Sequence, residues 1–185
     1  MKRSGTIVRT MRRDEFEQVR ELSIAAFGGD ASIGLLLDEL RSSWAWDDDL
    51  SFVAEVDGSI VGQVLYTRAF VDAPTRLLDV LVLSPVGVRP DLQRQSIGTS
   101  LIAESLRALG TRSEPLVFLE GHPSFYPRFG FRLASTMGFT PPSSRIPDAA
   151  FMVYPLPTYE PSMTGALVYS DAFWRADAVG LRPQP

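Results

Sequence analysis

Residues 93–98 (Gln-Arg-Gln-Ser-Ile-Gly) gather small and polar side chains where a buried strand is expected to turn into a helix. The strand ends near Val88-Arg89-Pro90, and apolar residues recur at helical spacing from Ile97 onward. A helix N-terminus presents unpaired N–H groups and the positive end of the helix dipole, so it binds phosphate readily. Small residues there let the backbone approach a pyrophosphate. The segment is a candidate anion site, although a strand-to-helix turn of this kind also occurs in α/β proteins without one.

A second candidate lies in residues 121–131 (Gly-His-Pro-Ser-Phe-Tyr-Pro-Arg-Phe-Gly-Phe), a turn rich in aromatic side chains. Its three phenylalanines are expected to be buried by a short helical turn, with Gly130 permitting a tight exit. Tyr126 differs from them because its phenol has a proton to donate. Glu120 and His122 are the nearest candidates for a general base, and a solvated strand-end charge and a turn histidine are the alternatives for them.

Together the two motifs resemble the GNAT superfamily of acetyl-CoA-dependent N-acetyltransferases. Its CoA-binding signature, [Q/R]-x-x-G-x-[G/A] after a strand ending in V-x-P, is similar to residues 88–98, with Ser96 at the position of the first glycine. Its members commonly carry a tyrosine followed four residues later by Gly-Phe, as Tyr126 is here. The resemblance extends more weakly over about residues 5–155.

The resemblance implies an N-acetyltransferase that moves the acetyl group of acetyl-CoA to a primary amine of a small molecule or peptide. It implies that Tyr126 protonates the departing CoA thiolate, and an amide near Val86 or Gly87 could polarise the thioester carbonyl. The residues that it assigns to CoA, along the strand edge and around the pyrophosphate, are Val86, Gly87, Val88, Gln93, Arg94, Gln95, Ser96, Ile97, Gly98 and Thr99. A non-catalytic acyl-CoA-binding module is the alternative.

Composition narrows the class of protein further. The 185 residues are 45% apolar and 22% charged, which is typical of a globular protein. The chain has no cysteine and a single histidine, so we expect no metal site, and the net charge of −4 argues against a nucleic-acid partner. No apolar run is long enough to span a bilayer, so a cytoplasmic protein without membrane contact is expected. A homodimer is compatible with the sequence.

The elements that must position these residues follow from periodicity and turn signals. A helix is expected to begin at Asp14 as its N-cap and to end at Gly28-Gly29, and Asp57-Gly58 indicates a hairpin. Pro85 predicts that a central strand bulges or loses its neighbour at this position. The other expected elements are strands over 6–10, 50–56, 60–69, 77–88, 115–119 and 149–154 and helices over 33–40 and 97–109. This order predicts a mixed α/β sheet flanked by helices, the GNAT-like fold.

Two regions outside the motifs carry further expectations. Trp44 and Trp46, followed by three aspartates at 47–49, could wall an acceptor site, and ordinary packing against the first helices is the alternative. The last thirty residues are rich in proline, yet 166–169 and 173–174 are apolar enough that part of this tail should pack down. We expect one domain over residues 1–185, with a core over about 5–155 and a C-terminal extension over about 156–185.

Overall fold

Within residues 5–180, the part of the chain that the computed structural model describes, nine strands form one mixed sheet. The strand order is β1-β2-β3-β4-β5-β8-β6, and β9 adds to β3 and carries β7 on its other side. The strands are β1 (Ile7–Thr10), β2 (Ser51–Val56), β3 (Ser59–Asp72), β4 (Leu77–Val88), β5 (Leu116–Glu120), β6 (Arg132–Leu133), β7 (Phe139–Thr140), β8 (Phe151–Pro155) and β9 (Gly165–Val168). The predicted mixed α/β fold is confirmed.

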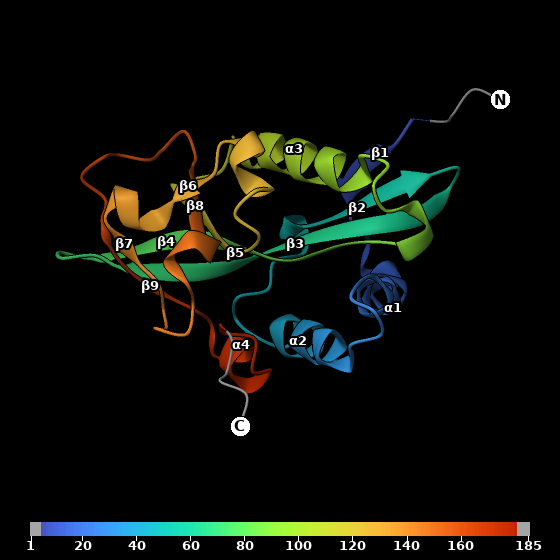
Figure 1. Ribbon diagram of the computed structural model, residues 1–185, viewed down its shortest axis with the longest axis horizontal. Helices are drawn as coiled ribbons and strands as arrows, with labels where there is room; N and C mark the ends of the chain where they lie inside the picture. The colour runs from blue at the N-terminus through green and yellow to red at the C-terminus, as the bar shows by residue number, and fades with distance from the viewer. Residues whose placement is uncertain (1–4, 181–185) are drawn as a thin grey trace.

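Helices cover both faces of the sheet (Figure 1). One face is covered by α1 (Phe16–Ala26), α2 (Ala31–Arg41) and the short α4 (Asp171–Arg175), and the other by α3 (Ile97–Leu109). Two apolar cores result: Leu37, Leu40 and Phe173 belong to the first, and Leu101 and Ile102 to the second. This division matters because the side chains of β4 and β5 alternate between the two cores.

The predicted hairpin at Asp57-Gly58 is confirmed. Both residues have positive φ, 50° and 75°, as a tight two-residue turn between β2 and β3 requires. The bulge predicted at Pro85 is confirmed as well, because the register of β3 against β4 shifts between Val64 and Tyr66, opposite this proline. Pro85 has no N–H to give to the ladder, so the bulge absorbs the position at which a bond would be missing.

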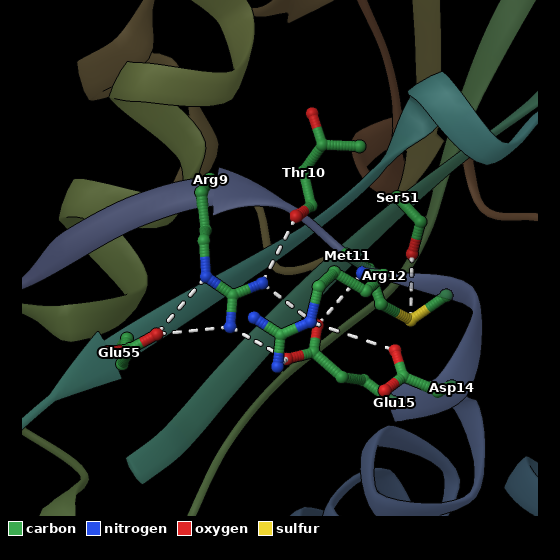
Figure 2. A network of polar contacts seen from close by, with 8 residues as sticks. All are labelled: Arg9, Thr10, Met11, Arg12, Asp14, Glu15, Ser51 and Glu55. Carbon is green, nitrogen blue, oxygen red and sulfur yellow. Dashed lines mark hydrogen bonds and ion pairs between the residues drawn. The ribbon is translucent and has the colours of Figure 1, made fainter. Parts of the chain in front are cut away.

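The predicted start of the first helix is wrong. A 3₁₀ turn over Arg13–Glu15 precedes α1, so Asp14 lies inside this turn instead of capping the helix. The carboxylate of Glu15 accepts the Arg12 N–H at 2.8 Å and two bonds from Arg9 at 2.7 and 2.8 Å (Figure 2). Arg9 also reaches Glu55 on β2 at 3.0 Å. The bond between Arg12 and Glu15 is a local capping box, whereas the pairing of Arg9 with Glu55 ties the same boundary to β2, a contact that no local pattern reveals.

The C-terminal segment packs against the sheet in part, as predicted. β9 pairs antiparallel with β3, where Phe70 lies opposite Val168, and in parallel with β7. Ser170 caps α4 by accepting the Ala172 N–H at 3.2 Å, and α4 packs against α2. The segment thus lies on the α1, α2 and α4 side of the sheet.

Candidate active site

The central parallel strands β4 and β5 diverge at their carboxyl ends. They pair over two residues each, in a register marked by Val82 opposite Phe118, although β4 continues to Val88 and β5 to Glu120. Beyond that point the β5-facing edge of β4 lies next to the loop that leads into α3. A gap between two central strands exposes backbone hydrogen-bonding groups that a ligand can use.

The pairing of β4 with β3 fixes which groups point into this gap. Arg89 donates its N–H to the Val61 carbonyl at 2.8 Å, so these two residues form a hydrogen-bonded pair. Hydrogen-bonded and non-hydrogen-bonded pairs then alternate along the antiparallel ladder. In the register that follows, Gly87 exchanges bonds with β3, whereas the N–H and C=O of Val86 and Val88 point away from β3. Val86 and Val88 therefore present their backbone groups at the free edge of β4.

Gln63 on β3 fixes the orientation of the peptide plane between Pro85 and Val86. Its side chain is fully buried, and Nε2 donates to the Pro85 carbonyl at 3.4 Å. The carbonyl and the N–H of a trans peptide point in opposite directions, so a Pro85 carbonyl held toward β3 turns the Val86 N–H toward the gap. This agrees with the direction that the ladder gives. A side chain at position 87 would be crowded, because a Cβ there would lie 3.0 Å from Ala26 on α1.

The loop before α3 leaves several backbone amides unpaired. Arg94 and Ser96 have positive φ of 60° and 65°, and the first bond of α3 runs from the Ser100 N–H to the Ser96 carbonyl at 2.9 Å. The amides of residues 97–99 therefore have no carbonyl one turn earlier. Positive φ next to a helix start turns successive N–H groups toward one point, where they attract an anion. Gln93 ties the loop to the Val88 carbonyl with a bond of 3.1 Å.

A hollow of about 300 Å³ opens beside this loop. Seven residues predicted to bind CoA line it: Val88, Gln93, Arg94, Ser96, Ile97, Gly98 and Thr99. Val86, Gly87 and Gln95 do not; Gly87 packs on α1, and Gln95 donates its side-chain amide to the Asp91 carbonyl at 3.5 Å. A second hollow of about 480 Å³ follows along α3 toward β8.

Three residues that line the first hollow were not among the predicted site residues: Leu92, Phe125 and Arg128. Phe125 lines the first hollow, and Arg128 lines both. The guanidinium of Arg128 lies 4.7 Å from the centre of the Phe125 ring. The expectation that all three phenylalanines are buried is thus wrong: Phe131 is buried, but Phe125 and Phe129 are partly exposed because they form walls of the two hollows. An arginine three residues after an aromatic in a turn was the available signal.

Tyr126 lies behind this wall at the end of β5, with 8% of its surface exposed. Phe125 and Phe131 pack edge-on against its ring at 5.1 and 5.7 Å, and a side chain at Gly121 would collide with it. Its hydroxyl has no hydrogen-bond partner among residues 5–180. Burial raises the pKa of Tyr126 to about 12, so at neutral pH the phenol keeps a proton that it can donate.

The other candidates, His122 and the two tryptophans, lie outside the hollow beside α3. The exposed His122 holds Ser124 in a turn, with 3.0 Å between its Nδ1 and the hydroxyl. Trp46 packs edge-on against Phe16 at 5.8 Å, and Trp44 stacks on Phe70 at 4.9 Å. The packing alternative therefore describes Trp46, whereas Trp44 lies against β3 with 48% of its surface exposed, and neither lines the hollow beside α3.

Two of the three aspartates that follow these tryptophans are engaged in ion pairs. Asp47 pairs with Arg68 at 2.8 Å and with Arg112 at 3.3 Å. Burial acts to raise the pKa of Asp47, but the bond from the Asp49 N–H and the two arginines hold it below its usual value. Asp48 pairs with Arg13 at 2.6 Å. Over residues 5–180, no group of three acidic or histidine side chains could hold a metal ion, and no helix is long and apolar enough to cross a membrane.

Diverging central strands beside a helix start with unpaired amides define an acyl-CoA-binding architecture. The chain belongs to the GNAT family: the model of the acetyltransferase (GNAT) domain matches residues 7–134. The chain is also 30% identical, over 86% of its length and 89% of the relative's, to the uncharacterized N-acetyltransferase YjhQ of Escherichia coli (strain K12). It is therefore an acyltransferase of the N-acetyltransferase type.

Solved structures agree with this assignment. The GNAT family N-acetyltransferase YhbS from Escherichia coli, solved in complex with CoA, is 25% identical with a TM-score of 0.79, and 92% of each chain is covered. A GNAT family acetyltransferase from Brucella melitensis in complex with acetyl-CoA is 28% identical with a TM-score of 0.71, over 91% of this chain and 98% of the other. Both similarities cover nearly the whole chain.

Proposed function

We propose that acetyl-CoA lies in the gap between β4 and β5, with its pyrophosphate at residues 94–99 and its pantetheine arm along Val86–Val88. The observation that carries this proposal is the free edge of β4, which ends beside the unpaired amides at the start of α3. CoA and acetyl-CoA in the two solved relatives support it. Arg128, next to the hollow, offers a further positive charge for a phosphate.

Acetyl transfer then depends on two groups of this chain, the Val86 N–H and the Tyr126 hydroxyl. The Val86 N–H would donate a hydrogen bond to the thioester oxygen and so stabilise the negative charge that develops there. The free amine attacks the carbonyl carbon, a C–N bond forms and the C–S bond breaks. Tyr126 would give its proton to the departing thiolate and recover one from the new amide nitrogen, because its buried phenol is protonated and has no partner within residues 5–180.

Calorimetry with CoA and a thiol-release assay test this proposal together. The chain has no cysteine, so every free thiol that appears comes from CoA. We expect CoA to bind wild-type protein and not Gly98→Trp, because the indole would fill the space that the pyrophosphate needs. Glu104→Trp, on the exposed side of the same helix, is the matched control and should bind normally. Binding without thiol release from any amine would favour a non-catalytic acyl-CoA-binding module.

The proposed enzyme works in the cytoplasm as a single domain over residues 1–185 that includes the C-terminal extension. The pairing of β9 with β3 and the packing of α4 on α2 support the inclusion of that extension. The absence of cysteine from the sequence suits a reducing compartment. Sedimentation of the full chain would test the homodimer, which stays a prediction.

A further inference from the structure

The end of β5 is flanked by two ionisable side chains on opposite faces of the sheet. Phe118 belongs to the core under α1, α2 and α4, whereas Leu119 belongs to the core under α3. By this alternation Glu120 faces the α1, α2 and α4 side. The neighbouring Gly121 lies directly against the ring of Tyr126, which belongs to the α3 side. Glu120 and Tyr126 therefore approach the gap from its two sides.

The same face opens to solvent next to Glu120. Val82 and Phe118, which are opposite each other in the β4–β5 register, are both buried. Two residues further along, Ser84 and Glu120 occupy the equivalent positions on the diverging strands, and both are partly exposed. A molecule approaching the gap from this face would thus meet a hydroxyl and a carboxylate before it met apolar side chains.

Residues of the C-terminal segment lie next to Glu120. The Gly180 N–H donates to Glu120 Oε2 at 3.2 Å, which leaves Oε1 without a bond from the described residues. Tyr169 is buried beside the carboxylate, and the charge of Glu120 adds to the effect of burial in raising the pKa of this phenol. Arg145, which pairs with Asp177 at 3.5 Å, supplies the positive charge of this region.

We propose that Glu120, together with the C-terminal segment over residues 169–180, forms the acceptor site and binds the ammonium group of a primary amine. This inference rests on the proposed acetyl transfer. Glu120 then takes one proton from the ammonium, which frees the nitrogen lone pair to attack the thioester. The second nitrogen proton leaves through Tyr126 to the CoA sulfur, and Glu120 releases its own proton to solvent. The products are the amide, CoA thiol and one proton.

The environment of Glu120 suits a base. Burial raises the pKa of this carboxyl, while the bond from Gly180 and the charge of Arg145 partly offset the rise. A carboxylate whose pKa is raised takes a proton more readily than an ordinary surface glutamate. Since a protonated Glu120 neither attracts nor deprotonates an ammonium, transfer to amines should fall as the pH drops through this pKa.

Glu120→Gln tests the inference, because its amide oxygen can still accept the Gly180 N–H while the charge is lost. The probes are a panel of alkyl and aralkyl primary amines, which are ammonium ions at neutral pH, and hydroxylamine, which is mostly unprotonated. We expect kcat/KM for the best amine to fall by about 10²-fold, with hydroxylamine affected far less and the KM for acetyl-CoA unchanged. The break that Glu120 gives to the acidic limb of the wild-type pH profile should vanish in the variant, whose rate with amines should instead rise with pH toward the pKa of the amine itself. Glu160→Gln, at an exposed position of the C-terminal extension outside residues 169–180, is the matched control.

The outcomes separate this inference from the proposed function. If the wild-type protein binds no CoA and acetylates no probe, the proposed function itself is wrong. If it acetylates hydroxylamine and Glu120→Gln keeps the wild-type kcat/KM and pH profile with amines, Glu120 only anchors the C-terminal segment. A wild-type protein that acetylates hydroxylamine but no member of the amine panel would also overturn the assignment of an ammonium site.

Discussion

The two sides of the gap between β4 and β5 present different kinds of chemical group, backbone groups on one side and side chains on the other. On the α3 side, the groups that we propose to face acetyl-CoA are backbone groups of Val86, Val88 and residues 97–99. On the opposite side, Glu120 and Ser84 present side chains, and the surrounding wall comes from a segment about 60 residues further along the chain. A site made of backbone groups depends on the backbone conformation, so it tolerates substitutions that preserve the φ angle and leave room for the ligand. A site made of side chains depends on the chemical identity of each residue.

Removing the hydroxyl of Tyr126 should have the largest kinetic effect. Tyr126→Phe keeps the ring and its packing, so kcat should fall by about 10²–10⁴-fold, and the lower end is expected because a thiolate is a fairly good leaving group. The Kd for CoA should barely change. With a pKa raised to about 12, Tyr126 stays protonated through neutral pH, so an alkaline limb below about pH 10 belongs to another group. Full kcat, with the chemical step shown to limit the rate, would make Tyr126 a packing residue.

Changing Gln63 should have a smaller effect on the same step. Gln63→Met keeps the side-chain length and removes the bond to the Pro85 carbonyl, so the Val86 N–H loses its fixed direction. We expect kcat to fall by about 10- to 100-fold, less than for loss of an entire oxyanion donor, with a nearly constant KM for acetyl-CoA. Thr67→Val is the matched control, because it removes a buried hydroxyl on the same strand that has no partner. Equal losses in both variants would point to general damage of β3.

Ser96→Gly should change CoA affinity by less than about tenfold, or roughly 1.4 kcal/mol. Ser96 has a positive φ of 65° and makes no side-chain cap bond, so glycine adopts this conformation more easily and restores the family signature. Thermal unfolding should show an unchanged or slightly higher stability, and calorimetry gives the affinity. Loss of binding would mean that the Ser96 hydroxyl is itself a ligand, and the site would no longer be one of backbone groups.

The ion pairs around Glu15 should affect stability and leave kinetics unchanged. The bonds from Arg9 and from the Arg12 N–H hold the pKa of Glu15 at about 2, against 4.5 for an ordinary glutamate. A lowered folded-state pKa stabilises the protein fully above the unfolded value, and this contribution is lost as the pH falls from about 5 toward 2. Glu15→Gln should lower the free energy of unfolding by about 2 kcal/mol at pH 7 and by much less near pH 2. Glu17→Gln, an exposed neighbour, should change it little at either pH.

The difference between the two sides also explains what the sequence could predict. The loop at 93–98, Tyr126, the hairpin and the bulge at Pro85 all depend on local residue patterns, so they were accessible from the sequence. The free edge of β4 was predicted through the family resemblance, but its physical reason needs the β3 register, which one strand does not encode. The contact of Glu120 with Gly180 and the pairing of Arg9 with Glu55 join distant segments, so the wall of the acceptor side and the start of the first helix escaped local analysis.

Amide NMR shifts during a titration with CoA test the division between the two sides most directly. We predict saturable shifts at Val86, Val88 and residues 96–99, with much smaller ones at Tyr169 and Gly180. The same amides should not move in Gly98→Trp. Shifts concentrated at the C-terminal segment, or an unperturbed β4 edge in a protein saturated with CoA, would contradict the claim that a backbone site on the α3 side of the gap holds the cosubstrate.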